Sequence, residues 1–180
     1  RSSPVKVGAL TNWKRLVEGP TNNGSSFAIK TDGTLWAWGD NSSGQLGLGD
    51  STARSSPVQV GLLTNWRQLA LGRPNPGVVA VKTDGTLWAW GYGNDGQLGL
   101  GDTAPRSSPV QVGALTTWSV VAASVAGFRA IKTDGTLWTW GSNTNGQLGL
   151  GVDTNHKSSP VQVGSLAIWK LPTFIGALTF

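Results

Sequence analysis

KTDGTLWAWG, from Lys30 to Gly39, returns unchanged from Lys82 to Gly91 and, with one substitution, from Lys132 to Gly141. These copies begin 52 and 50 residues apart. Two further blocks recur in fixed order with it: GQLGLG at 44–49, 96–101 and 146–151, and SSPV at 2–5, 55–58, 107–110 and 158–161. Self-similarity at a period of about 50 residues indicates a tandem array of one supersecondary unit.

The repeated unit has the alternation and the turn residues of short β-strands. FAIK at 27–30 and TLWAWG at 34–39 flank Thr31, Asp32 and Gly33. This pattern predicts a hairpin with a three-residue loop and glycine at the left-handed position. In the second strand the tryptophans point to one face, and Leu35 and Ala37 point to the other. A strand that is apolar on both faces predicts sheets stacked against sheets.

Three more stretches complete the unit. The element GQLGLG at 44–49 is expected to place leucines on one face and bare glycines on the other, where a backbone or a tryptophan ring can come close. PVQVG at 57–61 predicts a short edge strand because proline lacks a ladder donor, and another strand is expected at Leu69–Leu71. No window shows a convincing helical period.

The predicted fold is therefore all-β. Residues 1–180 form a single array of propeller blades, each of about four antiparallel strands. The units are drawn at residues 1–53, 54–105 and 106–156, with a partial fourth at 157–180. A solenoid and a β-sandwich are the rival architectures.

Composition narrows the classes of protein. The 180 residues include 26 glycines, ten tryptophans and no cysteine, which favours a turn-rich β fold and excludes disulfides and thiolate metal ligands. No apolar run reaches the roughly 18 residues of a membrane helix, so no membrane insertion is expected. The net charge is +5, but the cations that remain after local pairing look scattered along the sequence, which makes nucleic acid an unlikely partner. The chain opens on Arg1 and ends in a truncated copy, so a fragment of a longer array is expected.

DGTLWAWG, a short polar loop and GQLGLG, closed by a PVQV strand, together resemble the repeat of the regulator of chromosome condensation family. The resemblance implies four-stranded blades that belong to a larger propeller of about seven blades. The family includes an exchange factor for a small GTPase, inhibitors of secreted enzymes, and bacterial and phage proteins. The near-identical copies are closest in style to the regular arrays of bacterial and phage surface proteins. No binding residue of the family is carried over, because the stretches before the hairpins lack the histidine that many repeats place there.

A residue copied in every unit performs the same task in every unit, whereas an active site needs different residues that converge once. Asp32, Asp84 and Asp134 recur in the hairpin turns, where aspartate favours local backbone hydrogen bonds over acid–base catalysis. The single histidine, His156, has no counterpart in the sister units. Because the sequence has no cysteine and no second histidine, it lacks the residues for a zinc site or for a catalytic triad that uses cysteine or serine with histidine. We therefore predict that the protein is not an enzyme, with no catalytic, cofactor or metal site.

One apparent cofactor motif fails its context. Gly91, Gly93 and Gly96 spell the dinucleotide-binding pattern after a strand, yet no helix is expected to follow and receive a pyrophosphate. The sister units have Asn41 and Asn143 in place of Gly93, an exchange that predicts a left-handed turn position.

Because the cores repeat, specificity is expected where the copies differ. One set of differing stretches precedes the hairpins, at 18–26, 73–78 and 123–129. A second set follows them, at 40–43, 92–95 and 142–145, and is expected to form a second rim. The candidate partner-contact residues are Glu18, Asn22, Asn23, Arg73, Asn75, Tyr92, Asn94, Phe128 and Arg129. The alternative interpretation is that both sets are ordinary solvated turns.

Two functions from different classes remain. The first is a non-catalytic structural or adhesive module of a virion or a cell-surface assembly, with an extracellular or virion-surface location. Its partners would be proteins, further blades of the same array, or a surface glycan. The alternative is a regulatory propeller that acts on one protein partner, as an inhibitor or in the manner of an exchange factor.

Overall fold

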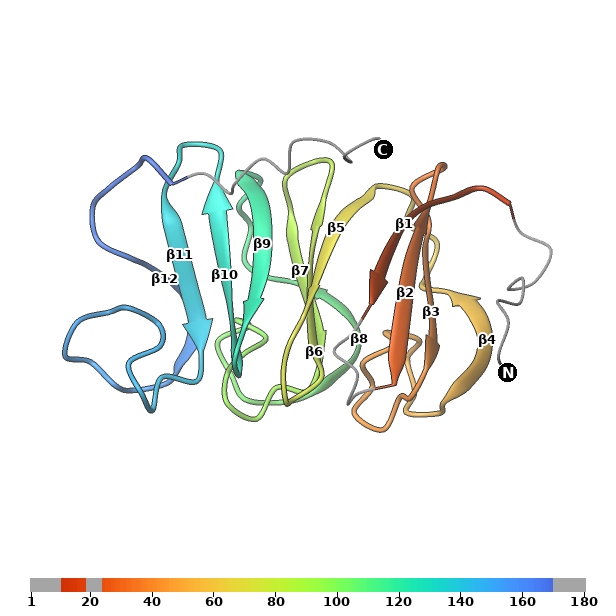
Figure 1. The fold of residues 1–180 in the computed structure, drawn as a ribbon, viewed down its shortest axis with the longest axis horizontal. Helices are drawn as coiled ribbons and strands as arrows, with labels where there is room; N and C mark the ends of the chain where they lie inside the picture. Colours follow the sequence, from red (N-terminus) through yellow and green to blue (C-terminus); the bar gives the residue numbers. More distant parts are fainter. Residues whose placement is uncertain (1–10, 19–23, 170–180) are drawn as a thin grey trace, which may run out of the picture.

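Three antiparallel sheets of four strands follow one another in the computed structural model, which describes residues 11–18 and 24–169 (Figure 1). The first sheet contains β1 (Trp13–Glu18), β2 (Ser25–Lys30), β3 (Leu35–Gly39) and β4 (Arg54–Gln59). The second contains β5 (Trp66–Leu71), β6 (Gly77–Lys82), β7 (Leu87–Gly91) and β8 (Arg106–Gln111). The third contains β9 (Trp118–Ser124), β10 (Gly127–Lys132), β11 (Leu137–Gly141) and β12 (Lys157–Gln162). Strands pair in chain order, and no helix occurs among the described residues, so the all-β prediction is confirmed.

The SSPV segment closes the sheet that precedes it. In the first sheet β4 pairs with β3, with Gln59 opposite Trp36 and Val58 opposite Ala37. Pro57 therefore lies in the last strand of a sheet, where its missing N–H leaves no ladder partner unsatisfied. This confirms the predicted edge strand.

The predicted hairpin turn is present in every unit. Gly33 has a φ of +80°, which is the left-handed region that glycine enters without strain. The Asp32 carboxylate accepts hydrogen bonds from the Thr34 backbone N–H (2.9 Å) and hydroxyl (2.7 Å). The same bonds join Asp84 to Thr86 in the second unit. These turn aspartates are therefore part of the fold.

The segment at 44–49 is not an extended element, and that expectation is wrong. It forms consecutive tight turns, in which the Gly47 N–H donates to the Gly44 carbonyl at 3.0 Å. The expected close approach is nevertheless confirmed, since a Cβ at Gly47 would lie 2.8 Å from the Trp90 Nε1. A side chain here would push the second sheet away from the first.

Two apolar cores lie between neighbouring sheets. The first joins the first and second sheets through Phe27, Ile29, Leu35, Ala37, Leu46, Val60, Trp66, Leu69, Val78, Ala80 and Trp90. The second joins the second and third sheets through Ala70, Val79, Val81, Leu87, Ala89, Leu98, Val112, Trp118, Val121, Phe128, Ala130 and Trp140. Because the middle sheet is buried on both faces, the stacking predicted from the two-sided strands is confirmed.

Each junction also carries a hydrogen bond from a fully buried indole. Trp90 donates from Nε1 to the Gln45 carbonyl at 2.8 Å, and Trp140 donates to the Gln97 carbonyl at 2.9 Å. On the third unit the equivalent carbonyl, that of Gln147, accepts a bond from Arg129 at 3.0 Å. The tryptophan of one unit thus finds its acceptor in the unit before it.

The position shared by Asn41, Gly93 and Asn143 is not left-handed, so that prediction is wrong. Asn41 is fully buried, its Nδ2 donates to the Asp50 carbonyl at 3.0 Å, and its Oδ1 accepts from the Leu46 N–H at 2.9 Å. The amide holds the long connection after β3 closed by binding its backbone.

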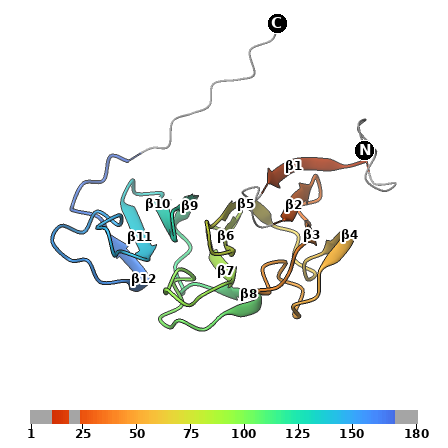
Figure 2. The same cartoon turned by 60° about the horizontal axis from the view of Figure 1, so that its bottom comes forward.

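The sheets have two different ends and one common edge. The hairpin face holds the hairpin turns and the linkers between sheets, at 31–33, 60–65, 83–85, 112–117 and 133–135. The loop face, at the opposite end, holds the connections after the first and third strands of each sheet, at 24, 40–53, 72–76, 92–105, 125–126 and 142–156. The first strands β1, β5 and β9 contact one another across the junctions and form what we call the first-strand edge, away from β8 and β12 (Figure 2). No described helix has the length and apolarity needed to cross a bilayer.

Candidate functional site

The two sets of differing stretches meet at one end of the molecule. In the second unit the Tyr92 N–H donates to the Pro76 carbonyl at 3.3 Å, and in the third unit the Ser142 N–H donates to the Ala126 carbonyl at 2.9 Å. The expectation of two separate rims is therefore wrong. In an antiparallel sheet the connections after the first and third strands share one end, and here they form the loop face.

Loops of neighbouring sheets are joined to each other on this face. Arg73 forms an isolated β-bridge with Val125, and the Ala126 N–H donates to the Arg73 carbonyl at 2.6 Å. Within the second unit Asn75 donates to the Asp95 carboxylate at 3.1 Å, which ties its two loops together. Backbone and side-chain bonds therefore join the loops of the second and third sheets to each other.

The predicted contact residues are distributed unevenly. Arg73 and Asn94 are exposed, and Asn75 and Tyr92 are half-buried on the loop face. Glu18 is the last residue of β1, while Asn22 and Asn23 lie outside the described residues.

Phe128 is the one candidate that the packing removes. Its side chain is fully buried and stacks on Trp140 at a centroid distance of 6.2 Å, so the prediction of a contact role is wrong. Arg129, next to it, is half-buried on the far face of the third sheet, where it binds the Gln147 carbonyl.

Val125 and Ala126 are loop-face residues that the list of candidates omitted. Val125 is 69% exposed, which is high for an apolar side chain in a tight connection. Ala126 has a φ of +56°, the left-handed region that residues other than glycine rarely occupy. The sequence signal was weak, because both residues stand in an apolar stretch that reads as strand.

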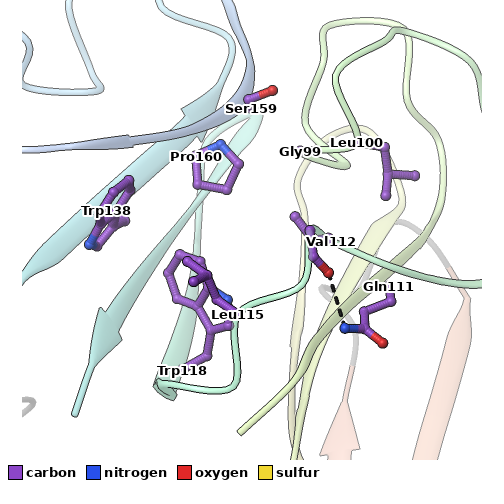
Figure 3. Close-up of a pocket in the computed structure, with 10 residues that line it drawn as sticks. Gly99, Leu100, Gln111, Val112, Leu115, Trp118, Trp138, Ser159 and Pro160 are labelled. Atoms are coloured by element: carbon purple, nitrogen blue, oxygen red, sulfur yellow. Dashed lines mark hydrogen bonds between the residues drawn. The ribbon is translucent and has the colours of Figure 1, made fainter.

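A cleft of about 310 Å³ lies between the second and third sheets (Figure 3). It is lined by Gly99, Leu100, Gln111, Val112, Gly113, Leu115, Trp118, Trp138, Ser159 and Pro160. The Lys132 ammonium lies 3.6 Å from the Trp138 ring centroid and 4.9 Å from that of Trp118. Lys82 lies in the same way over two tryptophans at the first junction, so this cleft belongs to the repeated frame.

Charge pairing follows two patterns. The connections after β3, β7 and β11 contain the ion pairs Asp50–Arg54, Asp102–Arg106 and Asp153–Lys157, at 2.6, 2.5 and 2.5 Å. The hairpin lysines instead stack on tryptophan rings, a favourable cation–π arrangement. Hydrogen bonds from Thr34, Thr86 and Thr136 hold the pKa values of the turn aspartates below their ordinary value. Among the described residues no three His, Cys, Asp or Glu side chains gather as a metal site.

The buried lysine predicts a pH dependence of stability. Desolvation lowers the pKa of Lys82 to about 8, against an ordinary value of 10.5, and the Asp84 charge offsets part of this effect. Between these two values the unfolded chain binds more protons than the folded one, so the free energy of unfolding should rise with pH across this window. Urea denaturation gives the free energy of unfolding of the wild type and of Lys82→Met. The value for the wild type should increase relative to that for the variant as pH rises. A difference that stays constant from below to above the window would contradict the assignment.

A family model for the regulator of chromosome condensation (RCC1) repeat matches residues 32–74, 84–128 and 134–169. The probable E3 ubiquitin-protein ligase HERC3 of Homo sapiens is 36% identical over 116 residues, which are 63% of this chain and 11% of HERC3. The RCC1 domain-containing protein RUG3, mitochondrial, of Arabidopsis thaliana is 33% identical over 130 residues, which are 70% of this chain and 28% of RUG3. The crystal structure of Prp20p from Saccharomyces cerevisiae, described with its binding properties to Gsp1p and histones, has a TM-score of 0.74 at 22% identity and covers 88% of this chain and 40% of its own.

These similarities correct the predicted location. One relative, RUG3, is named a mitochondrial protein, which is an intracellular setting, so the extracellular or virion-surface prediction is contradicted. The non-catalytic prediction has partial support. The ultraviolet-B receptor UVR8 of Arabidopsis thaliana, 32% identical over 114 residues, is named a receptor. HERC3 is named a probable ligase, and the match covers only 11% of it. The chain spans between 11% and 40% of the length of these proteins.

Proposed function

The chain belongs to the regulator of chromosome condensation (RCC1) repeat family, and from this we propose that it is part of a regulatory propeller that binds one protein partner through its loop face. The observation that carries the proposal is the gathering of the two sets of differing loops on one face. The blocks that repeat in every unit are near-identical, so a surface that distinguishes one partner from another has to use residues that differ, as those of the loop face do.

The loop face has the composition of a contact surface. Exposed Arg73 supplies a cation with five donors, Val125 supplies an apolar side chain, and half-buried Tyr92 is the aromatic group. Arginine and tyrosine are enriched among the residues that carry most of the binding energy at interfaces. The Asn75–Asp95 bond and the Arg73–Val125 bridge restrict these loops in advance, which reduces the entropy lost on binding.

The strained backbone at Ala126 supports the same surface. A non-glycine residue in the left-handed region costs on the order of 1–3 kcal/mol, and such strain concentrates at functional sites. Here it forms the tight connection that leaves Val125 exposed beside Arg73.

A structural or adhesive role is the less supported of the two hypotheses. It rested on the absence of cysteine and methionine, the low charge and the regularity of the copies, and the location that it implied is overturned. Prp20p, which shares the fold, is described by its binding to the proteins Gsp1p and histones.

The proposal is tested with paired surface variants. The loop-face variant Arg73→Glu with Val125→Ser is expected to bind the native partner at least about tenfold more weakly than the wild type, a loss of roughly 1.4 kcal/mol. The partner is first isolated from the source cells on the wild-type chain, identified by constant stoichiometry, purified, and titrated by calorimetry. The matched control is Thr31→Glu with Thr133→Glu, two exposed changes on the hairpin face, which should leave the affinity within about twofold. Weaker binding by the control variant with unchanged binding by the loop-face variant would overturn the proposal.

A further inference from the structure

One pocket at the first-strand edge is lined by three cations that have no carboxylate partner among the residues that the structure describes. The pocket lies between the first and second sheets, has a volume of about 390 Å³, and is lined by Lys14, Arg15, Ile29, Trp66, Arg67 and Thr83. No acidic residue is among them. The sequence made these cations look scattered, because Arg15 and Arg67 lie 52 positions apart. Pairing across the junction brings them together.

The two arginines are fixed by backbone carbonyls. Arg15 donates to the carbonyl of Arg67 at 3.3 Å, and Arg67 donates to the carbonyls of Trp118 (3.3 Å) and Ser119. A guanidinium has five N–H donors, so both arginines keep donors free after these bonds. Neither charge is neutralised, since a carbonyl carries no net charge. The Arg15 guanidinium is therefore fixed at the junction of the first and second sheets with unused donors, and that of Arg67 is held by β9 at the next junction.

The second junction provides an internal comparison. Strand registers place Lys14, Arg67 and Ser119 at one equivalent position, and Arg15 and Gln68 at the next. Gln68 donates to the carbonyl of Val121 at 2.9 Å, so it makes the same kind of inter-sheet bond as Arg15 without a charge.

The fold therefore does not require the three cations of the first junction. The second junction stacks its sheets in the same way with Arg67 as the one cation at the equivalent first-strand positions. Like charges held together raise the free energy of the unbound protein, and an anion would lower it.

We propose that this pocket binds a carboxylate-rich segment of the protein partner. The idea rests on the proposed function, because it names the chemistry of the partner. The Lys14 ammonium and the Arg15 guanidinium on β1, followed by the Arg67 guanidinium that β9 carbonyls hold, offer successive cations to a carboxylate-rich segment, and arginine can bind a carboxylate in bidentate fashion. A single-stranded nucleic acid would also need an aromatic stacking platform, and Trp66, the aromatic residue of the pocket, is only 3% exposed.

The test compares model ligands on the intact chain. Three fluorescent ligands are titrated by anisotropy at low and high salt. They are a hexaglutamate peptide, an uncharged hexaglutamine peptide, and a single-stranded oligonucleotide with the same net charge as hexaglutamate. The wild type should bind hexaglutamate, with affinity that falls as salt rises, and should bind the other two at least about tenfold more weakly. Tighter binding of the oligonucleotide through the same three residues would overturn the proposal in favour of nucleic acid.

The variant is taken from the chain itself. Lys14→Ser with Arg15→Gln and Arg67→Ser copies residues found at the equivalent positions of the second junction, and it should weaken hexaglutamate binding at least about tenfold. The control Arg106→Gln with Arg129→Gln removes two charges that belong neither to this pocket nor to the loop-face variant, and it should change hexaglutamate binding by about twofold or less. If the triple variant unfolds, Arg15→Gln alone keeps an inter-sheet donor and still should weaken binding. Equal losses of hexaglutamate affinity in the control and pocket variants would show a general charge effect and would overturn the proposed site.

A covalent readout locates the contact. Carbodiimide joins a carboxylate to an amine only where the two touch, so the peptide should be found on Lys14 and not on Lys157. Coupling at Lys157 with none at Lys14 would place the anion elsewhere. Because these ligands do not involve the loop face, failure here leaves the loop-face titration with the native partner intact, and the two failures are distinguishable.

Discussion

Trp90→Ala should lower the free energy of unfolding by about 3–5 kcal/mol, the range found when a large buried aromatic side chain is truncated. Trp90 is fully buried at the first junction, lies 5.6 Å from Trp66 in an edge contact, and donates to the Gln45 carbonyl. Truncation leaves a cavity between two sheets and an unpaired buried carbonyl. Guanidinium denaturation followed by circular dichroism measures the loss.

Trp38 provides the matched control for this change. It occupies the same strand position on the first sheet, is only half-buried, and contacts Trp13 at 6.3 Å within its own sheet. Trp38→Ala should therefore lose less than half of what Trp90→Ala loses. Equal losses would mean that contacts within a sheet, and not contacts between sheets, dominate stability.

Gly85→Ala should destabilise the chain by at least about 3 kcal/mol, because backbone strain and overlap act together. Gly85 has a φ of +77°, and a Cβ there would lie 2.0 Å from the Thr116 carbonyl oxygen. Relief requires the linker to move away from the hairpin, which breaks the bond from the Trp118 N–H to the Gly85 carbonyl at 3.0 Å. Thermal unfolding of the variant against the wild type checks the size of the effect.

Gly113→Ala separates the two causes. Gly113 also has a positive φ, of +61°, but a Cβ there would meet no atom within 4 Å. Only the left-handed backbone is then penalised, by about 1–2 kcal/mol. If both variants lose the same stability, the overlap with the linker contributes nothing and the close hairpin–linker packing is not important.

The fold was predictable because its unit is short, copied and locally consistent. Three patterns in the unit each have one structural interpretation: the TDG turn, the strand that is apolar on both faces, and the edge strand that contains proline. Each pattern occurs in all three units, which supported the same interpretation each time. The prediction for residues 44–49 was wrong because alternating leucine and glycine fits an extended strand as well as successive turns. The prediction of a left-handed turn at Asn41 was wrong. Asparagine tolerates such a turn, and the neighbouring sequence does not show that the Asn41 amide instead closes the loop after β3.

Other features required knowledge of how distant segments meet. The single loop face follows from the parity of antiparallel strands, but the burial of Phe128 depends on the neighbouring sheet. The basic pocket depends on the packing of β1 against β5 across the junction, which brings Arg15 to the backbone of Arg67. The loop-face bridge between Arg73 and Val125 joins equivalent positions of neighbouring units, and it too depends on how the two sheets pack.

The tryptophan–carbonyl bond between units has a consequence for how such arrays change by duplication. Each unit brings one indole donor for the unit before it and one carbonyl acceptor for the unit after it, as Trp90 and Gln97 do for the second unit. Adding or deleting one whole unit of about 50 residues therefore leaves every interior indole with an acceptor. An insertion of half a unit would separate an indole donor from its carbonyl acceptor. Recombination at the repeat period is thus tolerated, which is how near-identical copies can accumulate in one gene.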